Sequence, residues 1–354
     1  MRLGVLDVGS NTVHLLVVDA YRGAHPTPMS SKKTALRLAE QITDDGQLSD
    51  SGAAELVRTV DAARETAVEW GCDELMGFAT SAVREAGNSA EVIDLVRAET
   101  GVSLRVLAGI EEARLTFLAA RRWYGWSAGR LLVLDIGGGS LELATGIDEY
   151  PDTALSLPLG AGRLRRTRLR HDPPSKDEIV QTREWLDAEL APVAEQVREQ
   201  GPSDRVVATS KTFRSLARLT GTAPSSAGPR VRRVLSDSGL RQVIAFISRM
   251  PSADIGEPEG VSASRSHQLV AGALVAEAAM RAMSLTQLEI CPWALREGVI
   301  LRRLDHTNGT DQTVSAERLS GSNSWTADGR NEHAPSGSLG STGRTGQLGA
   351  RWSG

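Results

Sequence analysis

The sequence predicts an α/β protein made of two related domains, and three observations support this. Apolar runs rich in β-branched residues alternate with stretches of helical periodicity in both halves of the chain. The same hairpin pattern, an apolar strand closed by Asp and followed by a small-residue turn, occurs at residues 3–19 and 131–147. A length of 354 residues exceeds what one hydrophobic core usually holds. The closing aspartates, Asp7 and Asp135, are 128 positions apart (135 − 7), so the repeat indicates two half-molecules rather than a short-period array.

The first half is expected to alternate strands and helices. Residues 51–70, for example, place apolar side chains three or four positions apart, which is the spacing of one helix face. The expected strands are 3–8, 13–19, 75–79 and 104–107, and the expected helices are 51–70, 89–99 and 111–123.

The second half is expected to open with a hairpin and to continue mainly as helices. Its expected strands are 131–136, 141–147 and 205–208, and its expected helices are 175–198, 211–219, 237–250, 264–283 and 293–303. Stretches rich in Pro, Gly and Ser at 221–229 and 251–260 predict loops. From residue 306 few aliphatic residues remain, which predicts a disordered tail over 306–354. We expect domains at 1–125 and 126–305, with the last helix able to pack back on the first domain.

Composition excludes several classes of protein. A net charge of −4 and only 4% aromatic residues argue against a nucleic-acid binder. Two cysteines, Cys72 and Cys291, form neither a disulfide framework nor a metal-binding spacing. Asp7 interrupts the first apolar run, and no apolar stretch reaches the roughly 18 residues of a membrane span. We therefore expect a soluble, cytoplasmic protein with neither a nucleic-acid nor a membrane partner.

The first turn, residues 7–12 (DVGSNT), has the composition of a phosphate loop. Glycine lets the backbone approach an anion closely, and successive N–H groups in a tight turn form an anion-binding concavity. A carboxylate here would repel phosphate unless a divalent cation lies between them, as Mg²⁺ commonly does. The expected phosphate contacts are Gly9, Ser10, Asn11 and Thr12, with Asp7 as a metal ligand. For one copy alone, an ordinary hairpin turn is an equally good explanation.

The second turn, residues 135–142 (DIGGGSLE), favours phosphate binding more strongly. Three adjacent glycines cost conformational entropy, and a merely flexible loop fits poorly between two strongly apolar strands. The expected phosphate contacts are Gly137, Gly138, Gly139 and Ser140. The expected ligands of a metal or a water are Asp135 and Glu142.

Two further segments are ambiguous when taken alone. Residues 79–86 (ATSAVREA) end a strand and begin a helix, leaving N–H groups for an anion, and Arg84 is suited to a bidentate phosphate contact. A surface ion pair of Arg84 explains the segment as well. Glu111 and Glu112 open a helix, where the helix dipole alone accounts for paired acids, so the residues do not decide between that role and a general base.

Together, four segments in order resemble the exopolyphosphatase/guanosine pentaphosphate phosphatase family of the actin-like ATPase superfamily. They are LDVGSNTVHLLV, FATSAVREAGN, LAGIEEARLTFLA and VLDIGGGSLELATG. ICPWALREG, residues 290–298, also resembles the family's closing helix, and the resemblance covers residues 1–305. It is greatest to the short, two-domain actinobacterial exopolyphosphatases. The resemblance implies two actin-like (ribonuclease H-like) domains with an interdomain cleft.

The resemblance also implies roles for individual residues. Glu112 takes the place of the family's general base, and Asp135 that of its metal- and water-positioning aspartate. The cofactor implied is Mg²⁺, with Mn²⁺ and a monovalent cation left open, as is a homodimer. Two positions depart from the family: Leu141 replaces a usual Thr, and Lys211 lies where a glycine-rich turn is usual, so Lys211 is expected to supply charge to a phosphate. These departures bear on substrate preference.

The function implied is release of terminal orthophosphate from inorganic polyphosphate by Mg²⁺-assisted attack of water. Short chains are expected as substrates, because longer relatives carry extra C-terminal helical modules. Three alternatives remain open: a guanosine pentaphosphate 5′-phosphatase, an actin-like small-molecule kinase and a non-catalytic phosphate sensor. Two arginine runs are either solvated faces or a track for trailing polyphosphate. They comprise Arg163, Arg165, Arg166, Arg168 and Arg170, then Arg230, Arg232 and Arg233.

Overall fold

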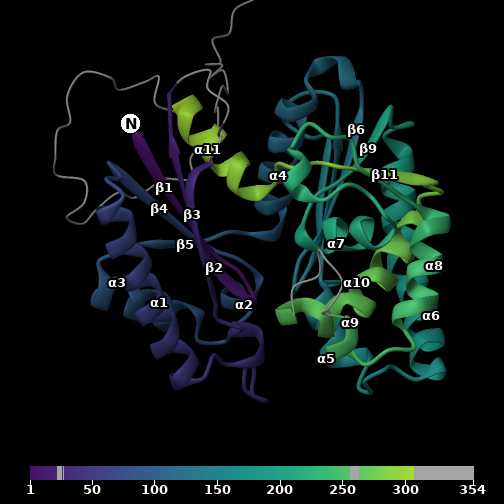
Figure 1. Cartoon of the computed structure of the whole chain (residues 1–354), viewed down its shortest axis with the longest axis horizontal. Coiled ribbons are helices and arrows are strands. Elements are labelled where there is room, and N and C mark those ends of the chain that lie inside the picture. The colour runs from purple at the N-terminus through teal and green to yellow at the C-terminus, as the bar shows by residue number, and fades with distance from the viewer. Residues whose placement is uncertain (22–25, 27, 256–262, 307–354) are drawn as a thin grey trace, which may run out of the picture. The chain divides into compact units, whose positions relative to one another are not determined.

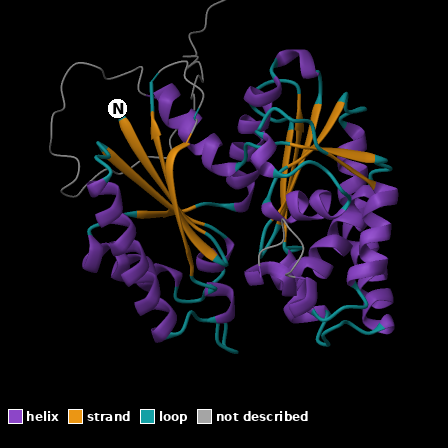
Figure 2. Cartoon of the chain, in the orientation of Figure 1, coloured by secondary structure: helices purple, strands orange, loops and turns teal. Residues whose placement is uncertain are grey.

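The computed structural model describes residues 1–21, 26, 28–255 and 263–306, and these form two mixed β-sheets with helices packed on them (Figures 1 and 2). The predicted α/β class is confirmed. Both sheets belong to one compact unit, so the division into domains at residue 125 stays a prediction. The predicted disordered tail lies outside the described residues, except for His306, which ends the last helix.

The first sheet has the strand order β3-β2-β1-β4-β5. β1 runs antiparallel to β2 and β2 to β3, whereas β1, β4 and β5 are parallel. The strands are β1 Arg2–Val8, β2 Thr12–Asp19, β3 Pro28–Ala35, β4 Glu74–Ala79 and β5 Leu104–Val106.

The second sheet has the order β10-β11-β9-β6-β7-β8. The run β8-β7-β6-β9-β11 repeats β3-β2-β1-β4-β5 in order and in strand direction, with β10 added at one edge. The predicted duplication is therefore confirmed. The strands are β6 Leu131–Ile136, β7 Leu141–Gly146, β8 Thr153–Leu157, β9 Arg205–Ala208, β10 Val234–Ser236 and β11 Gln287–Ile290.

Eleven α-helices lie within the described residues. The first four are α1 Asp50–Glu69, α2 Ser81–Arg84, α3 Ser89–Thr100 and α4 Gly109–Tyr124. The others are α5 Ala161–Arg168, α6 Lys176–Glu199, α7 Lys211–Leu219, α8 Asp237–Ile247, α9 Ser252–Ile255, α10 Ala263–Ala282 and α11 Leu295–His306. Short 3₁₀ helices span Leu38–Glu40, Trp126–Ala128 and Ser225–Ala227. None of the helices in the described part of the chain is long and apolar enough to cross a membrane.

Several elements were not predicted from the sequence. β3 is an edge strand whose side chains are almost all exposed, so it shows no alternation of apolar and polar residues. β10 and β11, with three and four residues, are too short to carry a periodicity. β8 and the arginine-rich α5 were also missed, and the four-residue α9 lies within the predicted loop at 251–260.

Helix α11 connects the second sheet back to the first. Val299 and Ile300 pack with Leu3 and Val5 of β1 in one buried cluster. A Cβ added to Gly298 would lie 2.0 Å from the carbonyl oxygen of Leu115 in α4, so only glycine permits this close approach. This packing places the start of α11 near the end of β1, where the candidate site begins (Figure 1).

Candidate functional site

The two glycine turns are built in the same way. In the first, the Gly9 N–H donates to the Thr12 carbonyl at 3.0 Å, and in the second the Gly137 N–H donates to Ser140 at 2.9 Å. Each turn therefore closes an antiparallel hairpin directly after its aspartate, as the sequence predicts.

A second segment binds the carbonyl groups of each turn. The Ser10 and Asn11 carbonyls accept from the N–H groups of Leu36, Arg37 and Ala39 at 3.0–3.1 Å. The carbonyls of the second turn accept from the start of α5 at 2.9–3.1 Å; the pairs are Ala161 to Gly137, Arg163 to Gly138 and Gly160 to Gly139. In the part of the chain that the structure describes, no acceptor pairs with the N–H groups of Ser10, Asn11, Gly138, Gly139 or Ser140. Both turns thus keep N–H groups available for an anion.

The two turns lie against each other. A Cβ built on Gly138 would be 2.8 Å from the Cβ of Ser10, and one on Gly139 would be 2.6 Å from the Ser81 hydroxyl. Ser10 and Ser81 share a buried hydrogen bond of 3.0 Å. Asn11 and Gln268 of α10 exchange amide hydrogen bonds of 3.2 Å in both directions. The structure therefore brings the predicted phosphate loops together, and glycine is required at their contact.

Four acidic side chains converge on these turns. Asp135 on β6 lies directly opposite Glu142 on β7, and both project from the same face. Thr209 donates a hydrogen bond to Asp135, and Ser156 donates to Glu142 at 2.9 Å. Burial raises the pKa of Asp7 and of Asp135. Burial, followed by the charges of Glu112 and Asp135, raises the pKa of Glu142 well above its ordinary value.

Glu112 lies in the first turn of α4 and is buried. An acid that only stabilises the N-terminus of a helix through the helix dipole is usually exposed to solvent. Burial is the main cause that raises the pKa of Glu112 to about 7, the charges of Asp7 and Asp135 add to the rise, and Arg84 opposes it. Arg84 donates to the Glu112 carboxylate and, at 2.8 Å, to the Leu107 carbonyl. A carboxylate with a pKa near neutrality is suited to general-base catalysis.

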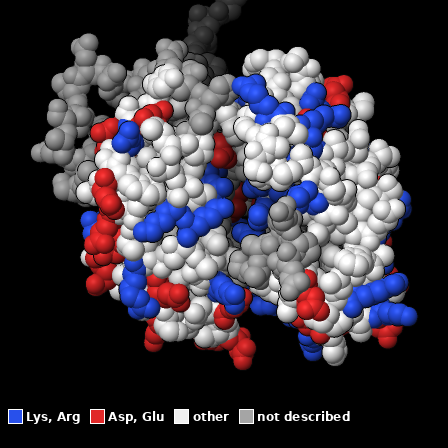
Figure 3. Space-filling view, in the orientation of Figure 1, with Lys and Arg blue, Asp and Glu red and all other residues white. Residues whose placement is uncertain are grey.

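Sequence reasoning missed most of the cations at this site. Partial loss of hydration, followed by mutual repulsion, lowers the pKa of four side chains that lie close together: Lys33, Lys211, Arg214 and Arg265. Arg296 contributes to this repulsion and lies 3.7 Å from the Asp7 carboxylate. Figure 3 shows a hollow with Lys and Arg along its sides and Asp or Glu within it. Such a cationic lining is suited to a polyanionic ligand.

His14 is a further residue that the sequence did not single out. It lies opposite Asp7 on β2, and its Nδ1 contacts Arg296. Burial, followed by the charges of Arg296 and Lys33, lowers the pKa of His14 to about 3. The ring is therefore neutral at physiological pH, with Nδ1 accepting from the guanidinium and the proton on Nε2.

The two positions that depart from the family pattern behave differently. Leu141 is completely buried in the hydrophobic core beside Ile136, so a hydroxyl at this position would face the core rather than the cleft. The segment containing Lys211 does adopt a glycine-like backbone, because Ser210 has a φ of 55°. Burial and the charges of Arg214 and Arg265 lower the pKa of Lys211, so these three cations lie near one another, and the role of Lys211 in charge supply stays a prediction.

The two arginine runs lie on different elements. In the first, Arg163 donates to the Gly139 carbonyl at 3.0 Å and pairs with Glu85, while Arg168 stacks 4.2 Å from the centre of the Trp185 ring. In the second, Arg233 binds four backbone carbonyls at 2.6–3.0 Å. Arg163, Arg168 and Arg233 therefore have partners within the protein, which is expected neither of a solvated face nor of a track for polyphosphate.

A divalent ion fits the acidic groups only in part. Within the described residues, no group of three or more His, Cys, Asp and Glu side chains is arranged to hold a metal. Mg²⁺, however, is commonly bound through one or two carboxylates together with substrate phosphates and water. Asp7 and Asp135 are two half-buried carboxylates. The charge of Asp135 raises the pKa of Asp7, and both charges raise the pKa of Glu112, so the two lie close together and provide such a pair.

The fold and this site define a class: a duplicated actin-like α/β protein with two facing phosphate turns around buried carboxylates. Comparison with known proteins agrees. The model of the Ppx/GppA phosphatase family matches residues 17–307, and the chain belongs to this family.

Individual relatives support the assignment. The chain is 65% identical over 305 residues to Exopolyphosphatase 1 of Mycobacterium tuberculosis, covering 86% of this chain and 89% of that protein. It is 64% identical to Exopolyphosphatase 1 of Mycobacterium leprae, covering 86% and 90%. The crystal structure of an exopolyphosphatase from Cytophaga hutchinsonii superposes with a TM-score of 0.78 at 24% identity, covering 86% of this chain and 98% of that one, and supports the fold.

Proposed function

We propose that this protein is an exopolyphosphatase that releases the terminal orthophosphate of inorganic polyphosphate. The observation that carries the proposal is the contact between the two glycine turns. Five N–H groups of these turns, those of Ser10, Asn11, Gly138, Gly139 and Ser140, have no acceptor in the described residues, and buried carboxylates and a cationic lining lie beside them. The names of the mycobacterial relatives support it.

The reaction follows from the chemistry of these groups. Glu112 in its ionised form accepts a proton from a water molecule, whose oxygen attacks the terminal phosphorus. The bridging P–O bond breaks on the opposite side, giving orthophosphate and a polyphosphate shortened by one unit. The N–H groups of the two turns, Arg84 and Lys211 stabilise the charge on the non-bridging oxygens. Arg265, Arg214 and Arg296 add positive charge for the rest of the chain.

We assign a divalent cation, Mg²⁺, to Asp7 and Asp135, with Glu142 as a further ligand or as a residue that orients water. A bound Mg²⁺ would neutralise charge between these carboxylates and the phosphate oxygens. The neighbouring hydroxyls of Thr209 and Ser156 hold two of the carboxylates in place.

One assay tests the proposal. Phosphate release is measured side by side from tripolyphosphate, long-chain polyphosphate and guanosine pentaphosphate, with Mg²⁺ and with EDTA. We expect phosphate release from tripolyphosphate without any added acceptor, and loss of this release when EDTA removes Mg²⁺. Release without an acceptor would also exclude a kinase.

Two results would contradict the proposal in different ways. Turnover of guanosine pentaphosphate alone would assign the same site to the other substrate of the family. No turnover of any of the three, combined with phosphate binding, would indicate a sensor instead of an enzyme.

A further inference from the structure

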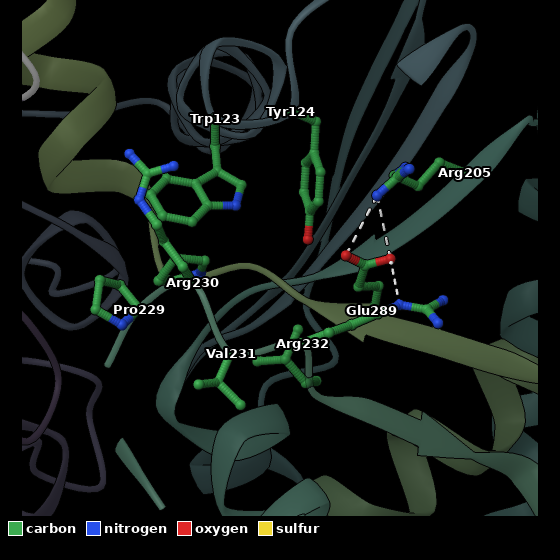
Figure 4. Close-up of a pocket in the computed structure, with 10 residues that line it drawn as sticks. Trp123, Tyr124, Arg205, Pro229, Arg230, Val231, Arg232 and Glu289 are labelled. Atoms are coloured by element: carbon green, nitrogen blue, oxygen red, sulfur yellow. Dashed lines mark hydrogen bonds and ion pairs between the residues drawn. The ribbon is translucent and has the colours of Figure 1, made fainter. Parts of the chain in front are cut away.

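A cavity of about 230 Å³ lies at the end of α4 that is remote from Glu112 (Figure 4). Tyr124 follows Glu112 by twelve positions in α4 (124 − 112), which corresponds to about 18 Å along the helix axis. The lining is Trp123, Tyr124, Arg205, Pro229, Arg230, Val231, Arg232, Glu289, Ile290 and Pro292. None of these residues belongs to the glycine turns or to the acidic groups of the candidate site.

Two aromatic side chains from the end of α4 point into the cavity (Figure 4). Trp123 is held edge-on by Trp293, with ring centres 5.2 Å apart and an interplanar angle of 62°. Tyr124 has the Arg205 guanidinium 4.8 Å from its ring centre. Both rings are therefore fixed in place, which favours stacking of a planar ligand.

The cavity is positively charged although the chain as a whole is acidic. Three arginines and one glutamate give a local charge of +2 (3 − 1), against −4 for the chain. Arg205 and Arg232 pair with Glu289 at 3.2 and 3.3 Å. Arg230 is exposed and makes no hydrogen bond or ion pair with the other described residues. An anion bound here would therefore find a guanidinium that is not already neutralised.

We propose that this cavity is a second ligand site, distinct from the catalytic one, for a small nucleoside phosphate. The base packs on Trp123 and Tyr124, and the phosphate pairs with Arg230 and Arg232. The volume is below the roughly 300–1,000 Å³ of drug-sized sites, so the cavity encloses the base alone, and the ribose and phosphate extend toward the exposed Arg230 and Arg232. A neutral ring would leave the positive charge unpaired, and a bare phosphate would make no use of the aromatic walls.

Calorimetric titration of the full chain with GMP tests the proposal, with guanosine, ribose 5-phosphate and inorganic phosphate as partial probes. We expect GMP to bind at least about 10-fold more tightly than each of these, since base stacking and phosphate pairing both contribute. Arg230→Ala should weaken GMP binding by about 10-fold or more. Arg249→Ala, at an exposed arginine outside the cavity, is the matched control and should bind as the wild type does.

A second pair of variants separates this site from the catalytic one. Arg230→Ala should leave hydrolysis of tripolyphosphate unchanged, whereas Arg265→Ala should impair hydrolysis and leave GMP binding intact. Loss of GMP binding in Arg265→Ala with retention in Arg230→Ala would place the nucleotide in the catalytic site and overturn the proposal. Equal affinity for GMP and ribose 5-phosphate, or no binding of GMP at millimolar concentration, would also overturn it.

Discussion

The two sheets place equivalent rows of side chains beside their glycine turns, and the rows differ in charge. The Asp7 row consists of Asp7, His14 and Lys33, which lie opposite one another on β1, β2 and β3. The Asp135 row consists of Asp135, Glu142 and Ser156 on β6, β7 and β8. The backbone is duplicated, whereas the second acid of one row is replaced by a neutral histidine in the other.

The difference in charge suggests that the two rows have different roles in the reaction. Arginine charges oppose the rise in the pKa of both aspartates: Arg296 and Arg265 act on Asp7, and Arg214 and Arg265 act on Asp135. In the Asp135 row, Asp135 and Glu142 stand opposite each other, and nearby Glu112 adds to the rise in the pKa of Glu142. Carboxylates that repel one another favour a proton or a cation between them. We therefore expect proton transfer beside the Asp135 row and binding of phosphate beside the Asp7 row.

The largest expected effect is that of Glu112→Gln. The amide has nearly the same shape but cannot accept the proton of the attacking water, so we expect kcat to fall by at least about 10²-fold. Phosphate release from tripolyphosphate measures this loss, and circular dichroism checks the fold. Glu111→Gln is the matched control, since Glu111 pairs with Arg105 instead of Arg84, and it should retain most of the activity. Near wild-type turnover of Glu112→Gln would remove Glu112 from the role of base.

The acidic residues of the two rows could be predicted from the sequence, whereas most of the cations near them could not, and the reason is physical. A glycine turn between two apolar strands is a local pattern, so Asp7, Asp135 and their hairpins could be located without a structure. Arg214, Arg265 and Arg296 lie on three helices far apart in the sequence, where an arginine is usually solvated. Only the packing of those helices shows that they converge.

Strands were missed for a similar reason. β3 carries Lys33 of the Asp7 row, but it is an exposed edge strand and has no apolar alternation. Its pairing with β2 gives it a fixed place in the sheet, and this pairing is a tertiary property.

A second prediction concerns pH. A base acts only when ionised, so kcat/KM should rise with pH through the pKa of about 7 of Glu112 and then level off. Two units below this value, at pH 5, kcat/KM should be about 100-fold below the plateau. A pH–rate profile at constant ionic strength measures this rise in kcat/KM. The residual activity of Glu112→Gln should not show it. The groups facing Glu112 are Arg84, Asp7, Asp135 and Glu142. If kcat/KM of Glu112→Gln still rises with pH in this range, the titrating group is one of the three other acids.

A third prediction tests whether the histidine of the Asp7 row orients Arg296. In His14→Leu the side chain has a similar volume but offers no acceptor to the Arg296 guanidinium, so we expect kcat/KM to fall by about 10-fold. His14→Asn restores an acceptor and should recover most of the loss.

The pH dependence distinguishes this role from proton transfer. Because the pKa of His14 is lowered to about 3, the effect of His14→Leu should be the same at every pH between 5 and 9. An equal loss in the Leu and Asn variants would show that shape, and not hydrogen bonding to Arg296, matters at this position.

The smallest expected effect on activity is that of Leu141→Thr, which restores the residue usual in the family beside the second glycine turn. Leu141 is fully buried and lies on the face of β7 opposite to Glu142, so the new hydroxyl would enter the core of the Asp135 sheet. We expect turnover and chain-length preference to change by less than about twofold, and the free energy of unfolding to fall by about 2 kcal/mol because volume is lost and a hydroxyl is buried. Leu143→Thr, two positions along the same face and also buried, is the matched control and should lose similar stability in chemical denaturation. A change in chain-length preference in Leu141→Thr, and not in Leu143→Thr, would contradict this expectation. It would show that the buried position 141 affects the substrate through the neighbouring glycine turn.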